Sequence, residues 1–161
     1  MKMSMYLKFQ LFEQQCGVLV PLTQDDVPSL SLGGYTFIIN GNAIPFDWDA
    51  FSGSEEDGIF EFETGYGWFN DFELPDYYDD EYKKLGLSRE DITAEFLASV
   101  ERIDEIHINF VNAADEEIDL GYNDDEQYNI NLLEIIITDM ETEKEYKVKQ
   151  SVLDEFNKGA M

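Results

Sequence analysis

Hydrophobic and polar residues alternate at the start of the chain. Met3, Met5, Leu7, Phe9 and Leu11 occupy every second position, which is the period of a β-strand that buries one face. The segments GVLVPL, YTFIINGNAIPF, GIFEFETGYGWF, EIHINFVN and NINLLEIIITD are also rich in β-branched and aromatic residues. The pattern therefore predicts a chain that is mainly β-structure.

Turn signals divide these segments into hairpins. Asn40-Gly41 is the strongest short hairpin signal in the chain, because both residues tolerate the positive φ angles of a tight turn. Pro45 predicts that the second strand of this hairpin lies at a sheet edge or is short. A turn is predicted at residues 64–67, and another at residues 140–143 joins the two strands near the C-terminus.

Three segments lack a clear period. Residues 23–34, TQDDVPSLSLGG, are predicted to form a loop or short helix, with a proline and the pair Gly33-Gly34 as breakers. Residues 71–82 indicate a loop or a loose helix. Residues 113–129 indicate the longest loop, or a β-excursion, of the second half.

One helix is predicted, over residues 88–101. Ser88 can cap its start, with Asp91 three residues on as the partner in a capping box. The hydrophobic residues that follow share one helical face: Ile92, Phe96, Leu97 and Val100. SVLDEF predicts a short closing helical turn. Because strands outnumber helices and follow one another, we expect a single α+β domain, residues 1–161, with a mainly antiparallel sheet.

Composition supports a folded protein with an unusual charge. The chain has 161 residues, of which 43% are hydrophobic and 14% aromatic, so it can bury a core. Its formal net charge is −26, whereas a small soluble domain typically carries a magnitude of about 2–8. Such an excess destabilises the compact state by self-repulsion. A basic partner or a high-salt habitat would explain it.

Cys16 is the only cysteine, so no internal disulfide can form. This favours a reducing compartment, and we expect Cys16 to be a small buried apolar residue. The sequence has no run of 18 apolar residues, and its N-terminus lacks the pattern of a signal peptide. We therefore expect a cytoplasmic protein that does not contact membrane.

No catalytic or metal motif is convincing. Asp115, Glu117 and Asp119 alternate as in an EF-hand loop, but Gly121 comes one place late, so only a structural cation is left open. The only histidine, His107, is predicted to lie on the solvated outer face of a strand. With 36 acidic residues some carboxylate pair always resembles a catalytic pair, and phosphate-binding and nucleophile motifs are absent. We expect a non-enzyme without cofactor or metal.

Charge is segregated along the chain. Residues 9–82 and residues 103–143 contain no Lys or Arg, and together they hold 29 of the 36 acids. Direct nucleic-acid binding is therefore not expected, because it needs basic residues to neutralise phosphate. In IFEFE the acids Glu61 and Glu63 should face solvent opposite two buried phenylalanines. Carboxylates two strand residues apart are separated by about 6.6 Å, about two axial phosphate steps of one DNA strand.

The acidic side chains and one tryptophan of two segments, residues 47–81 and residues 115–126, are the predicted contacts with a basic partner. They are Asp47, Trp48, Asp49, Glu55, Glu56, Asp57, Glu61, Glu63, Asp71, Glu73, Asp76, Asp79, Asp80, Glu81, Asp115, Glu116, Glu117, Asp119, Asp124, Asp125 and Glu126.

In size, charge and lack of a catalytic motif, the chain resembles the small acidic inhibitors made by phages and mobile elements. These are anti-CRISPR and anti-restriction proteins, many of them DNA mimics. The resemblance implies a protein that occupies the nucleic-acid-binding surface of a bacterial defence nuclease. Two alternatives stay open: an immunity protein for a basic nuclease toxin, and an acidic enzyme, cation-binding or halophilic domain. A homodimer is also left open.

Overall fold

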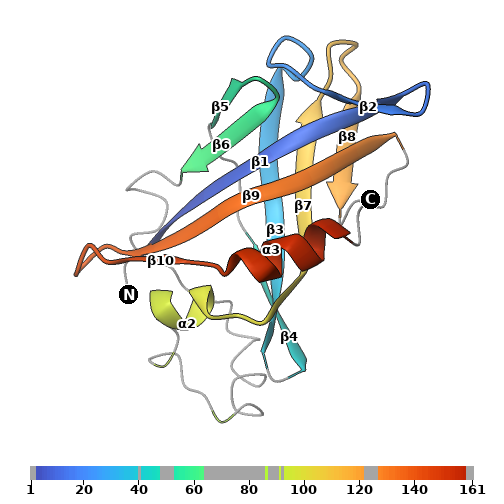
Figure 1. Cartoon of the computed structure of the whole chain (residues 1–161). Helices are drawn as coiled ribbons and strands as arrows, with labels where there is room; N and C mark the ends of the chain where they lie inside the picture. Colours follow the sequence, from blue (N-terminus) through green and yellow to red (C-terminus); the bar gives the residue numbers. More distant parts are fainter. Residues whose placement is uncertain are drawn as a thin grey trace.

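The computed structural model describes residues 3–39, 41–47, 53–63, 86, 91, 93–121 and 127–158, with the backbone alone for residues 39, 42–47 and 53–55. These residues form two antiparallel sheets and two helices (Figure 1). The predicted fold class, α+β with a mainly antiparallel sheet, is confirmed.

Sheet A has the strand order β10-β9-β1-β6-β5, with β2 also paired to β1. Its strands are β1 (Met3–Gln15), β2 (Val18–Pro21), β5 (Gly53–Glu56), β6 (Ile59–Glu63), β9 (Tyr128–Asp139) and β10 (Glu145–Lys147). Sheet B has the order β4-β3-β7-β8. Its strands are β3 (Ser29–Ile39), β4 (Asn42–Asp47), β7 (Arg102–Val111) and β8 (Glu117–Gly121).

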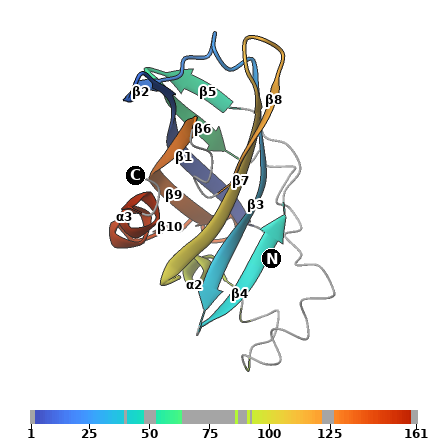
Figure 2. The same cartoon turned by 90° about the vertical axis from the view of Figure 1, so that its right-hand side faces the viewer.

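The two sheets enclose one hydrophobic core. Figure 2 shows them as separate layers, with β1, β9 and β10 on one side and β3, β7 and β8 on the other. The five alternating residues at the start of β1 are all buried, as predicted. Phe9 stacks on Phe60 and Phe62 of β6, with ring centroids 5.8 and 5.5 Å apart. Opposite them, Ile106, Ile108 and other inward residues of sheet B complete the same cluster.

Two short helices lie beside β9 and β10. Helix α3 (Gln150–Lys158) buries Val152, Leu153 and Phe156 and contacts both β9 and β7. The sequence predicted only a helical turn there. Helix α2 (Ala94–Ala98) packs against β9 and β10. The two helices therefore cover core residues of both sheets.

Two of the predicted hairpins are present. Ile39 pairs with Asn42 across the turn at Asn40-Gly41, and Gly41 has a φ of 79°. Strand β4, which contains Pro45, lies at the edge of sheet B. Strands β9 and β10 pair across residues 140–143. The predicted turn at residues 64–67 and the segment at residues 71–82 lie outside the described residues.

The prediction of a loop or short helix over residues 23–34 is wrong in its second half. Thr23–Asp26 form a turn, but β3 starts at Ser29 and continues through Gly33-Gly34. Leu30 and Leu32 alternate with serines and pack towards the core. This alternation favours a strand, and the two glycines that follow do not end it. The glycines mark a shift in register between β3 and β7 instead of a strand end.

The predicted bounds of the helix at residues 88–101 are also wrong. The described helix α2 ends at Ala98, and Ser99 is its C-cap. Its N-cap is Thr93, whose hydroxyl accepts a hydrogen bond of 3.1 Å from the Phe96 N–H. Thr93 can therefore cap this helix without the serine five residues upstream. Residues 87–90 and 92 lie outside the described residues.

Cys16 is exposed, and the prediction that it is buried is wrong. Cys16 and Gly17 have φ angles of 53° and 81° and form the two-residue turn between β1 and β2. Positive φ angles at both central positions are those of a type I′ turn, and the two-residue connection leaves Cys16 at the exposed tip of the hairpin. Turn geometry thus overrides the apolar character of the thiol.

Candidate interaction surface

The outer face of sheet B collects polar side chains from three neighbouring strands. The strand register sets Asn109 of β7 opposite Asp119 of β8, and Val111 opposite Glu117. On the other side of β7, Ser31 of β3 pairs with Asn109. We call this surface the sheet-B face and define it by nine residues: Ser29, Ser31, Thr36, Glu105, His107, Asn109, Val111, Glu117 and Asp119.

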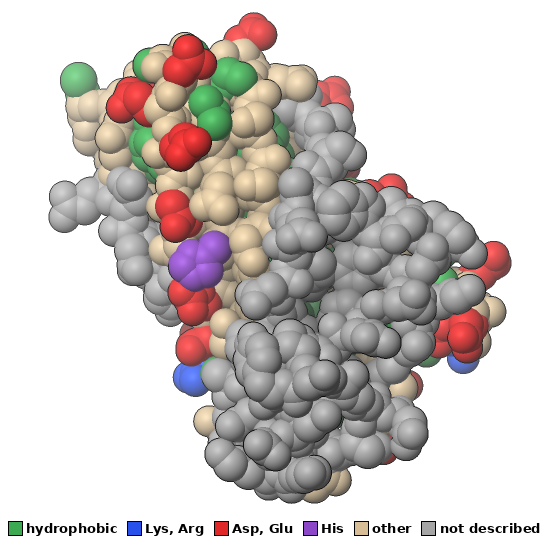
Figure 3. Space-filling model, turned by 180° about the vertical axis from the view of Figure 1, so that it is seen from behind, with side chains coloured by type: hydrophobic (Ala, Val, Ile, Leu, Met, Phe, Trp, Pro, Cys, Tyr) green, Lys and Arg blue, Asp and Glu red, His purple; other side chains and the backbone are tan. Residues whose placement is uncertain are grey.

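Acidic charge on the sheet-B face is hardly compensated. Glu105 and Asp119 have side chains that are 47% and 69% exposed, and Glu117 is also exposed. Within the described strands of this sheet, Arg102 is the only Lys or Arg, and its guanidinium lies 3.7 Å from the carboxylate of Asp104. Figure 3 shows the acidic side chains of this face in red around the histidine in purple.

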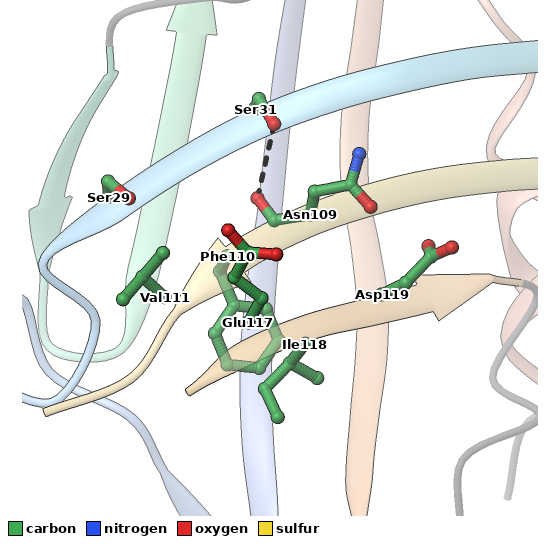
Figure 4. A pocket seen from close by; sticks show the side chains of 8 residues that line it. All are labelled: Ser29, Ser31, Asn109, Phe110, Val111, Glu117, Ile118 and Asp119. Carbon is green, nitrogen blue, oxygen red and sulfur yellow. Dashed lines mark hydrogen bonds between the residues drawn. The ribbon is translucent and has the colours of Figure 1, made fainter. Parts of the chain in front are cut away.

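A shallow recess of about 430 Å³ lies within the sheet-B face. Figure 4 shows its lining side chains, which come from β3, β7 and β8. The hydroxyl of Ser31 donates a hydrogen bond of 3.5 Å to the backbone carbonyl of Asn109. Glu117 and Asp119 supply carboxylates at its rim, while Val111 adds an apolar wall. The two carboxylates only accept hydrogen bonds when ionised, and they suit a basic group.

His107 lies on this outer face as predicted, between two buried isoleucines, but it is not simply solvated. Its Nε2 makes a short contact with a carboxylate oxygen of Glu105 on the same strand. Its Nδ1 lies 3.7 Å from a carboxylate oxygen of Asp119 on β8. The imidazole passes over Gly121, where an added Cβ would lie only 2.6 Å from Nδ1.

The outer face of sheet A carries the predicted pair Glu61 and Glu63. Both are exposed, as expected from the alternation in β6. The hydroxyl of Tyr6 donates a 2.5 Å hydrogen bond to Glu61. Burial, together with this bond and nearby carboxylates, raises the pKa of the Tyr6 hydroxyl well above its ordinary value. Glu61 therefore has a structural partner as well as solvent.

Basic residues are interleaved with the acids on sheet A. Lys8 of β1 is opposite both Glu61 of β6 and Glu134 of β9. The ammonium of Lys147 on β10 lies 3.8 Å from Glu134. Sheet A thus carries both acidic and basic residues on its outer face, whereas the nine residues of the sheet-B face include three acids and no Lys or Arg. The outer faces of two packed sheets point away from each other, so Glu61 and Glu63 lie on the opposite side of the described fold from Glu117 and Asp119.

Four of the predicted acids lie in turns or directly beside them. Glu56 and Asp57 are exposed at the turn between β5 and β6. Asp115 and Glu116 are exposed in the turn between β7 and β8, at the end of the sheet-B face. The side chain of Asn112 orders this turn by accepting hydrogen bonds of 3.0 Å from two turn amides, one of them that of Glu116.

The remaining predicted residues are placed in part. The backbone of Asp47 ends β4 and pairs with Gly34 of sheet B, and Glu55 lies in β5. The others lie outside the described residues: Trp48, Asp49, Asp71, Glu73, Asp76, Asp79, Asp80, Glu81, Asp124, Asp125 and Glu126.

Sequence reasoning missed Glu105 as a member of the surface. The segment EIHINF places Glu105 and His107 on the same side of a strand, which was a usable signal. The approach of Asp119 to His107 gave no such signal, because it depends on the pairing of β8 with β7.

Comparisons with protein families, with curated proteins and with solved structures find no match for this chain. Among the residues that the structure describes, no helix is long and apolar enough to cross a membrane. The same residues contain no group of three or more His, Cys, Asp or Glu side chains arranged to hold a metal ion.

Proposed function

We propose that this protein is a non-enzymatic inhibitor that binds the basic nucleic-acid-binding surface of a bacterial nuclease, and that it acts as a DNA mimic inside the cell. The supporting observation is the sheet-B face, where Glu105, Glu117 and Asp119 project from paired strands. The one Lys or Arg in the described part of this sheet, Arg102, lies beside Asp104 instead. The net charge of −26 adds long-range attraction for such a partner.

The fixed positions of the carboxylates on the paired strands matter as much as their negative charge. Carboxylates on a strand repeat about every 6.6 Å, and neighbouring strands lie about 4.8 Å apart. A paired sheet therefore holds acidic groups at spacings comparable with the phosphates of a duplex. Because the strands are already ordered, binding costs less conformational entropy than it would for a flexible acidic tail.

The test starts from the immobilised protein and a bacterial lysate. We expect the retained partner to be a basic nucleic-acid-binding protein whose duplex binding is lost when our protein is added. The protein alone should not shift duplex or single-stranded nucleic acid in a mobility assay. Tight binding of the protein itself to nucleic acid, or a partner that keeps its duplex binding, would rule out the mimic. The identity of the partner distinguishes a defence nuclease from a toxin nuclease.

Three variants, each with two acids replaced by lysine, test which surface binds the partner. Glu117→Lys with Asp119→Lys changes the sheet-B face, Glu61→Lys with Glu63→Lys changes the outer face of sheet A, and Asp154→Lys with Glu155→Lys changes exposed positions on α3. Each alters the net charge equally. We expect the first pair to weaken inhibition by tenfold or more, at about 1.4 kcal/mol per tenfold, and the α3 pair to have the smallest effect. Equal effects of all three would show that only total charge matters.

Association should be strongly salt-dependent. Exposed charges are screened beyond about 8 Å at physiological ionic strength. Higher salt should mainly slow association, because steering is lost, and should change dissociation less. An association rate that stays flat from low to high salt would indicate an apolar interface instead.

A further inference from the structure

The two ring nitrogens of His107 face acceptors from two different strands. Glu105 of β7 meets Nε2, and Asp119 of β8 lies within ion-pair distance of Nδ1. Ionised carboxylates only accept hydrogen bonds. A neutral imidazole has one N–H and one lone pair, so it can donate to only one of them. Only the protonated ring can donate towards both carboxylates.

The strand register leaves room for this arrangement. His107 pairs with Gly34 of β3 on one side and with Gly121 of β8 on the other, so no cross-strand side chain covers the ring. An added Cβ on Gly33 would lie 3.3 Å from the His107 Cβ, and one on Gly121 would lie 2.6 Å from Nδ1. Glycine at these positions lets the imidazole lie across β8 and reach Asp119.

No other described titratable group on these three strands competes with the two carboxylates for the ring. The residues of the neighbouring strands that face it in the register are Gly33, Gly34 and Gly121, and the next positions on the same face are Ser31, Thr36, Glu105, Asn109 and Asp119.

We propose that His107 makes this surface pH-sensitive: protonation lets the imidazole bridge Glu105 and Asp119, and the added positive charge weakens binding of a basic partner. This inference rests on the proposed function of the sheet-B face and adds its regulation. Imidazole is the side chain whose charge ordinarily changes between about pH 5 and 8, whereas carboxylates stay ionised above about pH 5. His107 is the only histidine of the chain.

A fluorescein-labelled oligo-arginine peptide serves as the probe, with binding measured by fluorescence anisotropy at about pH 6 and about pH 8 and constant ionic strength. For the wild type we expect the dissociation constant to rise about threefold to tenfold from the higher to the lower pH, as one charge at contact distance implies. His107→Gln, which stays neutral, should show less than about twofold change. If the dissociation constant changed by the same factor between the two pH values in both proteins, the switch would be overturned and the proposed function would stay intact.

A second variant tests the bridge itself. Gly121→Ala keeps the histidine, but its Cβ would displace the ring from the position next to Asp119. We expect the pH effect to shrink to the level of His107→Gln while thermal unfolding stays cooperative. A full pH effect in Gly121→Ala would overturn the bridge. Absence of peptide binding at both pH values, or binding insensitive to the Glu117→Lys and Asp119→Lys double reversal, would overturn the proposed function and the switch together.

Discussion

The amide of Asn157 on α3 replaces a missing neighbouring strand at one position of β9. Its Oδ1 accepts a hydrogen bond of 2.8 Å from the Leu132 N–H, and its Nδ2 donates one of 2.8 Å to the Leu132 carbonyl. Strand β10 pairs with β9 only at residues 136–138, so this part of the edge has no strand partner among the described residues. One side chain thus satisfies both backbone groups and joins α3 to sheet A.

Asn157→Ala should lower the free energy of unfolding by about 1–3 kcal/mol, because two half-buried backbone groups lose their partner. Urea unfolding followed by circular dichroism measures the change. Ser151→Ala, an exposed position on the same helix, is the control and should change stability by less than about 0.5 kcal/mol. Equal stabilities of the two variants would show that water replaces the amide without cost.

Two tyrosines make the protein sensitive to alkali. Burial raises the pKa of the Tyr35 hydroxyl, and burial with nearby carboxylates raises that of Tyr6. Above about pH 10, the ordinary tyrosine pKa, the unfolded chain loses these protons while the folded chain keeps them. The free energy of unfolding should therefore fall as pH rises from about 10 towards the raised folded-state values. Urea unfolding at about pH 8 and about pH 11 should show a smaller loss for Tyr35→Phe than for the wild type; parallel losses would contradict this.

At the scale of elements, the hairpin turns fix the strand register. The turns at Cys16-Gly17 and Asp57-Gly58 both have two positive φ angles, 53° and 81° in the first and 54° and 79° in the second. Such turns match the right-handed twist of the strands that they join. They hold β1 against β2 and β5 against β6, and so set which residues of β6 face the core.

The two turn glycines should respond differently to alanine. An added Cβ on Gly17 meets no atom within 4 Å, so Gly17→Ala should cost only the left-handed backbone strain, about 1–2 kcal/mol. A Cβ on Gly58 would lie 2.6 Å from the Pro21 Cβ. Gly58→Ala should therefore cost about 3 kcal/mol or more, because overpacking adds to the same strain. Thermal and urea unfolding of the pair measure the difference, and equal losses would mean that β2 moves freely away from the turn.

At the scale of the whole molecule, the two sheets distribute charge unequally. Sheet A alternates acids with Lys8 and Lys147, whereas the sheet-B face has no comparable basic residues among those described. With a net charge of −26, repulsion between acids opposes the compact state. This repulsion is the energetic cost of a surface that attracts a basic partner.

Sodium chloride should therefore stabilise the free protein. Screening shortens the range of repulsion from about 10 Å at 0.1 M salt to about 3 Å at 1 M. We expect the melting temperature to rise by several degrees over this range, since each kcal/mol shifts it by about 2–4 °C in a chain of this size. A melting temperature that stays constant would mean that the acids are already compensated in the fold.

Much of the fold could be predicted from local pattern. The alternation from Met3 to Leu11 determined which face of β1 is buried, and the same period exposed Glu61 and Glu63. Asn40-Gly41 determined a hairpin, because the turn depends on two residues only. The left-handed turn at Cys16 was missed, since a cysteine carries no strong turn signal. The strand through Gly33-Gly34 was missed because two glycines outweighed the alternation before them.

The candidate surface was only partly predictable. The sequence by itself determined the excess of acid and the outward direction of Glu105 and His107 along β7. Only the tertiary structure decided that β8 pairs with β7, which brings Asp119 to the imidazole, and that Lys8 lies opposite Glu61 in sheet A. The physical reason is that the period of a strand specifies its two faces but not its neighbours. The neighbours are chosen by packing of the whole core, and the neighbours determine whether a charge is compensated.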